Sequence, residues 1–183
     1  MLKAIFSGMI GRFEKQFRYD ASYMRHILRG STASFAKFAV LPSIVDRKAA
    51  PAAALAAAGI AGTVAEDCGP CTQISVDIAA SHGVPPQVLR AILAADETAM
   101  GEDAALAWRF ARASLARDLE ACDPLRDEIV RRWGDKGLVA ISLSLMTARM
   151  YPTVKYALGY GKACSKVVVA GEATPVAPLP LAA

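Results

Sequence analysis

Apolar side chains recur along the chain at the three- and four-residue spacing of amphipathic helices. Residues 2–17 give the first example, with leucine, isoleucine, methionine and phenylalanine on one helical face and lysine and arginine opposite them. The same periodicity predicts helices over about 52–66, 70–81 and 102–121. Only the stretch VVVA at 167–170 has the composition of a β-strand.

Proline, glycine and aspartate divide the C-terminal half into further predicted helices. Pro124 should open one that ends at Trp133 and Gly134, Asp135 should cap the next, and Pro152 should open the last, which runs to about residue 164. We expect about eight helices in all. Because no linker divides the chain, the pattern predicts one all-α bundle.

The composition agrees with that fold class. The chain has 183 residues, of which 54% are hydrophobic, so one domain with a sizeable core is expected. Alanine is abundant, and it is the best helix former. We expect a basic helical N-terminal extension over 1–48, a helical core over 49–170 and a flexible tail over 171–183.

The net charge of +4 is unevenly placed along the chain. Residues 1–48 carry nine lysines and arginines against Glu14, Asp20 and Asp46, whereas the remainder is slightly acidic. The basic residues are spread at helical intervals, which favours a solvated face or a subunit contact. Peripheral contact with an anionic membrane surface is the alternative, and nucleic acid is the less favoured partner.

The hydrophobic pattern predicts neither a membrane-spanning helix nor a secretory signal. No apolar run reaches the ~20 residues of a spanning helix, and we recognise no secretory signal. We therefore expect a cytoplasmic protein whose four cysteines are mostly reduced.

Two of those cysteines stand three residues apart in EDCGPCTQ, residues 66–73. Pro70 suits the first turn of a helix, so Cys68 should lie just outside that helix and Cys71 within its first turn. A helix N-terminus favours the thiolate form of cysteine, and the spacing lets the two sulfurs form a disulfide. The motif therefore offers an attacking thiolate and a resolving thiol together.

The pair allows three other interpretations. Two neighbouring thiols can simply pack in a core. A zinc site needs a second pair of ligands, which Cys122, Cys164, His26 and His82 do not form, so we expect no metal and no cofactor. CGPC also occurs in thioredoxin, where a buried strand precedes it; here the preceding segment is alanine-rich and helical in pattern, so that fold is not expected.

An alanine-rich helix that runs into C-x-x-C, followed by amphipathic helices, resembles the alkylhydroperoxidase branch of the carboxymuconolactone decarboxylase family. The resemblance covers about residues 50–165 and implies an all-α bundle that assembles as a homo-oligomer, as a dimer, trimer or hexamer. It also implies that Cys71 is the peroxidatic thiol and Cys68 the resolving one. By the logic of thioredoxin, in contrast, the outer Cys68 would be the more exposed nucleophile.

The chain departs from the family pattern at two positions. Ser75 stands where the family's peroxidases have a histidine, and Ala56 stands where they have a glutamate. Glu66 is then the nearest candidate base, although a carboxylate at a helix end is also common without function. Asp67 is expected to cap the next helix, and Lys155 is a further candidate from the last helix. Decarboxylation, the reaction of other members of that family, is the weaker option, because the polar residues that they place around a lactone carboxylate are not recognisable in this sequence.

These observations favour a thiol-dependent peroxidase or disulfide reductase. Cys68, Cys71 and Glu66 are its candidate catalytic residues, a hydroperoxide or disulfide is its substrate, and an external dithiol is its reductant. The rival is a non-enzymatic helical module, for interaction or small-ligand binding, whose cysteines are structural.

Overall fold

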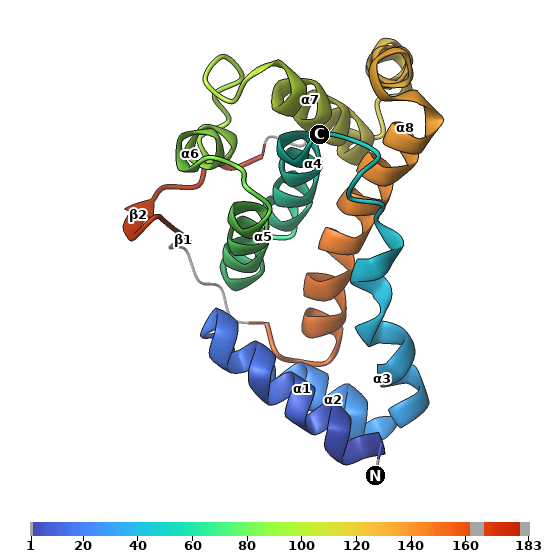
Figure 1. Ribbon diagram of the computed structural model, residues 1–183, viewed down its shortest axis with the longest axis vertical. Coiled ribbons are helices and arrows are strands. Elements are labelled where there is room, and N and C mark those ends of the chain that lie inside the picture. The colour runs from blue at the N-terminus through green and yellow to red at the C-terminus, as the bar shows by residue number, and fades with distance from the viewer. Residues whose placement is uncertain (1, 162–166, 180–183) are drawn as a thin grey trace.

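One helix, α4 (Ala52–Ala65), forms the centre of the main bundle and packs against α5 (Gly69–Ser81), α6 (Pro86–Leu93), α7 (Glu102–Ala116) and α8 (Leu119–Ala157) (Figure 1). The computed structural model describes residues 2–161 and 167–179. In that part of the chain the remaining elements are α1 (Leu2–Phe17), α2 (Ser22–Gly30), α3 (Thr32–Ala39), a 3₁₀ turn η1 (Leu41–Ile44), β1 (Val167–Val169) and β2 (Glu172–Thr174). The predicted all-α bundle is confirmed.

Small side chains explain why α4 can lie at the centre. Nine of its residues are buried, and they are spread around the whole helix rather than along one stripe. Most of them are alanine or glycine, so neighbouring helices come close to its backbone. At Gly62 an added Cβ would lie 3.0 Å from the carbonyl oxygen of Leu145 and 3.2 Å from the Cβ of Ala148, both on α8. The α4–α8 contact is therefore closed to larger side chains.

The C-terminal half is divided into fewer helices than its proline, glycine and aspartate residues predict. α7 ends at Ala116, earlier than predicted, because Arg117 takes a left-handed conformation with φ of 59°. α8 then begins at Leu119 under an Asp118 cap and continues to Ala157, with a break in helical geometry at Gly134 (φ 67°). The predicted break at Gly134 is thus confirmed as a kink.

Pro124 and Pro152 do not open helices, as the sequence had suggested, but both lie inside α8. Proline lacks the N–H of one helical hydrogen bond. The residues Tyr151 and Val154, which flank Pro152, pack against the N-terminal helices, which supports a continuous helix here. The predicted end of the last helix near residue 164 lies outside the described residues.

The N-terminal helices form a second, smaller core at one end of the bundle (Figure 1). Its buried members are mainly aromatic or aliphatic: Ile10, Tyr19, Ala21, Tyr23, Leu28 and Phe35. Phe13 and Tyr19 meet edge to face at 5.8 Å between ring centroids. The extension over 1–48 is therefore packed against Ile74 of α5 and Val154 near the end of α8 through apolar side chains.

The predicted strand at 167–170 is confirmed as β1, which pairs antiparallel with β2 through Val167 and Thr174. The side-chain amide of Gln73 on α5 bonds both backbone groups of Val168, at 2.6 and 3.0 Å, and so fastens the hairpin to the bundle. Further on, the Ala177 N–H donates to Leu93 O at 2.8 Å. The flexibility expected for 171–183 stays a prediction, and residues 180–183 lie outside the described part.

Among the helices described, none combines the length and the apolar composition needed to cross a bilayer.

The α4–α8 contact gives the first testable prediction. Gly62→Val should lower the free energy of unfolding by about 2–3 kcal/mol, because the added carbons meet a backbone carbonyl that cannot move aside easily. The matched control is Gly8→Val on the exposed side of α1, where an added Cβ meets nothing within 4 Å. Urea denaturation measures both, and equal effects of the two substitutions would contradict the close packing.

Candidate functional site

The two cysteines lie where α4 turns into α5. Asp67 takes a left-handed conformation, with φ of 49°, which reverses the chain direction directly after α4. Cys68 then occupies the N-cap of α5, and Pro70 lies in its first turn as the sequence predicted. The expected cap by Asp67 is wrong, since no side chain caps this helix and Asp67 belongs to the turn instead.

Cys68 and Cys71 are joined in a disulfide, with Cα atoms 5.2 Å apart. Both side chains are buried: Cys68 is 1% exposed and Cys71 is 5% exposed. The Thr72 N–H and hydroxyl both donate to the carbonyl oxygen of Cys68, at 2.8 and 3.1 Å, which fixes the first turn around the pair. The spacing expected for disulfide formation is therefore confirmed, and the pair is held inside the protein.

Two contacts hold this turn against α8. The carboxylate of Glu66 pairs with the Arg149 guanidinium, whose Nε donates to Oε1 at 2.7 Å. The hydroxyl of Tyr156 donates to the backbone carbonyl of Asp67 at 2.9 Å. Glu66 thus lies beside the disulfide in sequence, but its carboxylate is engaged by a cation of the neighbouring helix. Its role as a proton acceptor stays a prediction.

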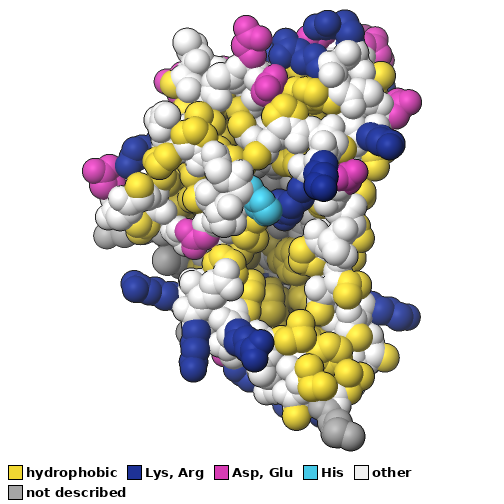
Figure 2. Space-filling view, in the orientation of Figure 1, with side chains coloured by type: hydrophobic (Ala, Val, Ile, Leu, Met, Phe, Trp, Pro, Cys, Tyr) yellow, Lys and Arg dark blue, Asp and Glu magenta, His cyan; other side chains and the backbone are white. Residues whose placement is uncertain are grey.

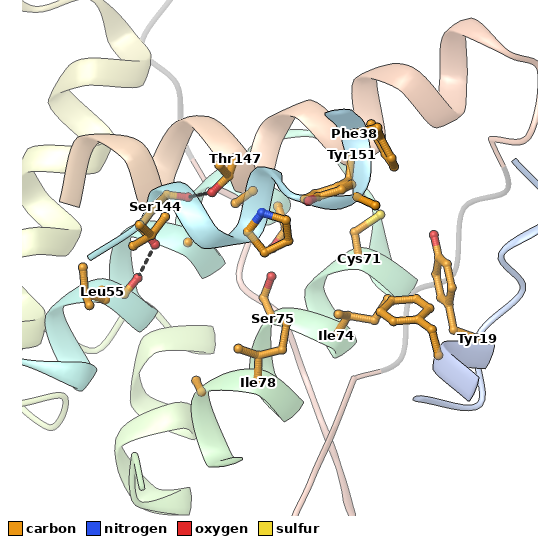
Figure 3. A pocket seen from close by; sticks show the side chains of 18 of the residues that line it. Tyr19, Phe38, Leu55, Cys71, Ile74, Ser75, Ile78, Ser144, Thr147 and Tyr151 are labelled. Carbon is orange, nitrogen blue, oxygen red and sulfur yellow. Dashed lines mark hydrogen bonds between the residues drawn. The ribbon is translucent and has the colours of Figure 1, made fainter. Parts of the chain in front are cut away.

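A cavity of about 390 Å³ opens on the other side of Cys71. Its wall is almost entirely apolar and comes from α1, α2, α3, α4, α5 and α8. In Figure 3, Cys71 and Ser75 project into this space from α5, while Tyr151 projects from α8. Cys68 does not line the cavity. The two sulfurs therefore differ in access, because only that of Cys71 belongs to a residue of the cavity wall.

The N-terminal helices complete the cavity. Ile10, Phe13, Tyr23 and Phe35 of the second core all line it, opposite the cysteine-bearing helix. Figure 2 shows the resulting hollow, with a hydrophobic floor, between the N-terminal helices and the rest of the molecule. The extension over 1–48 is thus part of the site.

Both positions at which the chain departs from the family pattern lie in this cavity. Ala56 on α4 and Ser75 on α5 line it together with Cys71. Lys155 does not line it, but its buried ammonium lies 5.3 Å from the ring centroid of Tyr19, which does. The two positions Ala56 and Ser75 therefore present a methyl and a hydroxyl group to the cavity, and neither can serve as the imidazole or carboxylate of a proton relay.

Most hydroxyl groups in the cavity wall already have backbone partners. Ser144 donates to Leu55 O at 2.9 Å, Thr147 to Leu143 O at 2.8 Å and Thr63 to Ile60 O at 3.0 Å. Tyr151 differs, because its hydroxyl is buried and has no hydrogen-bond partner within the described part of the chain. An unpaired buried hydroxyl is costly, so this group is free to bind a ligand atom.

Burial also sets the protonation of the tyrosines at the cavity. Desolvation raises the pKa of Tyr151 to about 12, and it raises the pKa of Tyr19 to about 12 as well. At neutral pH both hydroxyls are therefore protonated, and Tyr151 is a hydrogen-bond donor rather than a base.

The remaining cysteines lie away from this site. Cys122 is a free, buried thiol whose sulfur lies 3.6 Å from the Ser114 hydroxyl, and Cys164 lies outside the described residues. Over residues 2–161 and 167–179, no three side chains of histidine, cysteine, aspartate or glutamate come together as a metal site would require.

Comparison with known proteins adds no relative. No family model, no curated protein and no solved structure matches the chain. The arrangement around the cysteine pair therefore has to be interpreted from its own chemistry.

The sequence placed Tyr151 with Lys155 on the last helix, as possible neighbours of the cysteine pair, but favoured Lys155 of the two. It missed the aromatic residues of α1–α3 as parts of the site. The sequence did contain one signal for them. Residues 6–38 are rich in phenylalanine and tyrosine, which are usually buried and are not expected in a segment that is only a solvated basic face.

The unpartnered hydroxyl gives the second prediction. Tyr151→Phe should leave the free energy of unfolding unchanged or raise it by about 1 kcal/mol, because it removes a buried polar group that has no partner. Ser144→Ala is the matched control and should cost about 1 kcal/mol, since it removes a hydroxyl that bonds Leu55 O. Thermal denaturation of the oxidised protein compares them; a loss for Tyr151→Phe as large as that for Ser144→Ala would show that its hydroxyl is paired.

Proposed function

We propose that this protein is a thiol-dependent oxidoreductase that reduces an apolar hydroperoxide, or a disulfide that can enter the cavity, at Cys71. The observation that carries this proposal is the position of Cys71: it closes a disulfide with Cys68 on one side and lines the apolar cavity on the other. The resemblance to the alkylhydroperoxidase branch points to the same chemistry. We further propose that the protein is a cytoplasmic homo-oligomer.

Access favours Cys71 over Cys68 as the attacking thiol. In the reduced protein Cys71 lies in the first turn of α5, where the free N–H groups stabilise a thiolate. Cys68 lies at the N-cap, is 1% exposed and has no part in the cavity wall. This assignment agrees with the family resemblance and disagrees with the thioredoxin comparison.

The proposed oxidation has two steps. The Cys71 thiolate attacks the outer oxygen of the hydroperoxide, so that an S–O bond forms, the O–O bond breaks and the sulfur becomes a sulfenic acid. The departing alkoxide takes a proton from the Tyr151 hydroxyl, which solvent then reprotonates. The Cys68 thiol next attacks Cys71 Sγ, which forms the disulfide and releases the sulfenic oxygen as water.

An external dithiol restores the protein. Its first thiolate attacks Cys71 Sγ from the cavity and expels Cys68 as a thiolate; its second thiol then closes the reductant's own disulfide and releases Cys71. When a substrate disulfide is reduced instead, Cys71 attacks one of its sulfurs and Cys68 resolves the mixed disulfide. In this scheme the Glu66–Arg149 ion pair holds the cysteine turn in place.

A second function is favoured by the burial of both cysteines. If the disulfide only fastens the α4–α5 turn, the cavity is a binding site for a small apolar molecule and the protein is not an enzyme. The two functions differ in one property, which is the reactivity of the folded, reduced pair toward peroxide.

That difference is the third prediction. One equivalent of cumene hydroperoxide should close the Cys68–Cys71 disulfide in the reduced, folded protein, as measured by mass spectrometry after thiol alkylation. With Cys68→Ser, Cys71 should accumulate as a sulfenic acid that dimedone traps, whereas Cys71→Ser should give no trapped product at position 68. Cys122→Ser is the control and should behave as the unmodified protein, because Cys122 is buried elsewhere.

Two outcomes would contradict the proposal in different ways. Trapping at Cys68 but not at Cys71 would reverse the roles of the two thiols. A pair that stays unreactive until the protein unfolds would support the binding module instead.

Replacing Tyr151 tests the proton donor in the fourth prediction. Tyr151→Phe should slow the reaction with cumene hydroperoxide by roughly 10²-fold, in the lower range for general acid catalysis. It should leave the rate of alkylation of Cys71 by iodoacetamide within about twofold, because that reaction needs no proton donor. Stopped-flow kinetics measures both rates, and equal slowing of the two reactions would show that Tyr151 only positions Cys71.

A further inference from the structure

We propose that the cavity binds an amphiphile with one carboxylate, a medium-length fatty acid or its hydroperoxide, with its chain in the cavity and its carboxylate at Arg47 and His82. The inference deepens the proposed function, because it names the class of hydroperoxide that would reach Cys71. The binding part can be tested without any turnover.

The interior of the cavity fits an apolar chain. Its volume of about 390 Å³ lies within the range of ligand pockets and corresponds to roughly a dozen groups of methylene or water size, at about 30 Å³ each. The hydroxyls of Ser144, Thr147 and Thr63 are already bonded to the backbone. A molecule inside therefore meets carbon on nearly all sides, with the Tyr151 hydroxyl as an unpaired donor for one oxygen.

The charge at the cavity is positive. Arg47 lines it with an exposed guanidinium, the exposed imidazole of His82 also lines it, and no aspartate or glutamate is among its lining residues. Within the described chain, no carboxylate forms an ion pair with Arg47. The neighbouring Asp46 lies outside the lining and accepts the Lys48 N–H at 3.0 Å.

The two side chains come from different parts of the chain. Arg47 follows the η1 turn, and His82 ends α5, the helix that carries Cys71. Figure 2 shows a histidine together with lysine or arginine side chains along the upper edge of the hydrophobic hollow. A carboxylate bound there stays in contact with water, while the chain attached to it extends toward the interior.

This arrangement selects against other ligands. A cationic amphiphile would bring its charge next to Arg47, and a molecule with two charged ends would bury one of them in carbon. A neutral chain would bind through the same interior but would not use the cationic edge. The ligand that uses both parts of the site is a molecule with a single apolar chain and one anionic end.

The test is isothermal titration calorimetry on the oxidised protein, in which the disulfide prevents thiol chemistry. Decanoate should bind, and each pair of methylenes added from octanoate to dodecanoate should tighten binding by up to roughly tenfold. Decanoate should bind up to about fivefold tighter than 1-decanol, as expected for one solvent-exposed ion pair. Decyltrimethylammonium should bind more weakly than decanol.

Neighbouring lysine and arginine residues offer a matched pair of variants. Arg47→Gln should reduce the affinity for decanoate to that for decanol and leave decanol binding unchanged. Lys48→Gln removes an adjacent exposed cation that does not line the cavity, and it should change neither affinity. Ala56→Leu fills part of the cavity and should weaken decanoate and decanol alike, with circular dichroism used to confirm that this variant is folded.

The proposal is overturned if decanoate does not bind, if it binds no tighter than decyltrimethylammonium, or if Arg47→Gln and Lys48→Gln act equally. In the reduced protein, a fatty-acid hydroperoxide should react several-fold faster than its methyl ester, and Arg47→Gln should remove that difference. If decanoate binds as expected but no hydroperoxide closes the disulfide, the thiol chemistry fails while the binding inference stands.

Discussion

The close approach of α4 to α8 is the constraint on which the site depends. Glycine and alanine on α4 let the two helices pack closely. If Gly62 had a Cβ, that atom would lie only 3.0 Å from the backbone of α8. This contact leaves the end of α4, and the turn that follows it, within reach of Arg149 and Tyr156 on the same helix. If the two helices packed less closely, these contacts would be lost and the turn that carries the cysteine pair would not be held in place.

The site then results from two separate cores that meet. The main core fixes Cys71 at the start of α5, and the smaller N-terminal core supplies the aromatic wall opposite it. Because the cavity lies between them, neither core alone would enclose it. The combination separates the two sulfurs by environment: one faces the cavity, and the other is sealed beneath the turn.

The sequence predicted those parts of the structure that local chemistry determines. The helices of α1, α4 and α5, the Pro70 turn, the hairpin strand at 167–169 and the kink at Gly134 all follow from periodicity or from residues with restricted backbones. Errors arose where packing overrides local preference. Pro152 lies within a helix because the turns on both sides of it pack against other elements. Arg117 ends α7 in a left-handed conformation, which arginine rarely adopts and which the sequence therefore does not predict.

The candidate site was predictable only in part for the same reason. Cys68 and Cys71 are visible as a motif because their spacing is local, and Ser75 and Ala56 were located through the family resemblance. Tyr151, Arg47 and His82 come from three separate elements, and only tertiary packing brings them to one cavity. Their convergence has no local pattern that a reader of the sequence could recognise.

The central claim is that the cavity is the route by which substrate reaches Cys71. The most direct test measures the rate at which iodoacetamide alkylates Cys71 in the reduced, folded protein with and without saturating cumyl alcohol, an unreactive molecule of similar size to the substrate. If the account is correct, the alcohol slows alkylation of Cys71 by at least about tenfold, as occupancy of the cavity requires. An unchanged rate with the alcohol demonstrably bound would show that Cys71 is reached by another path and would contradict the account.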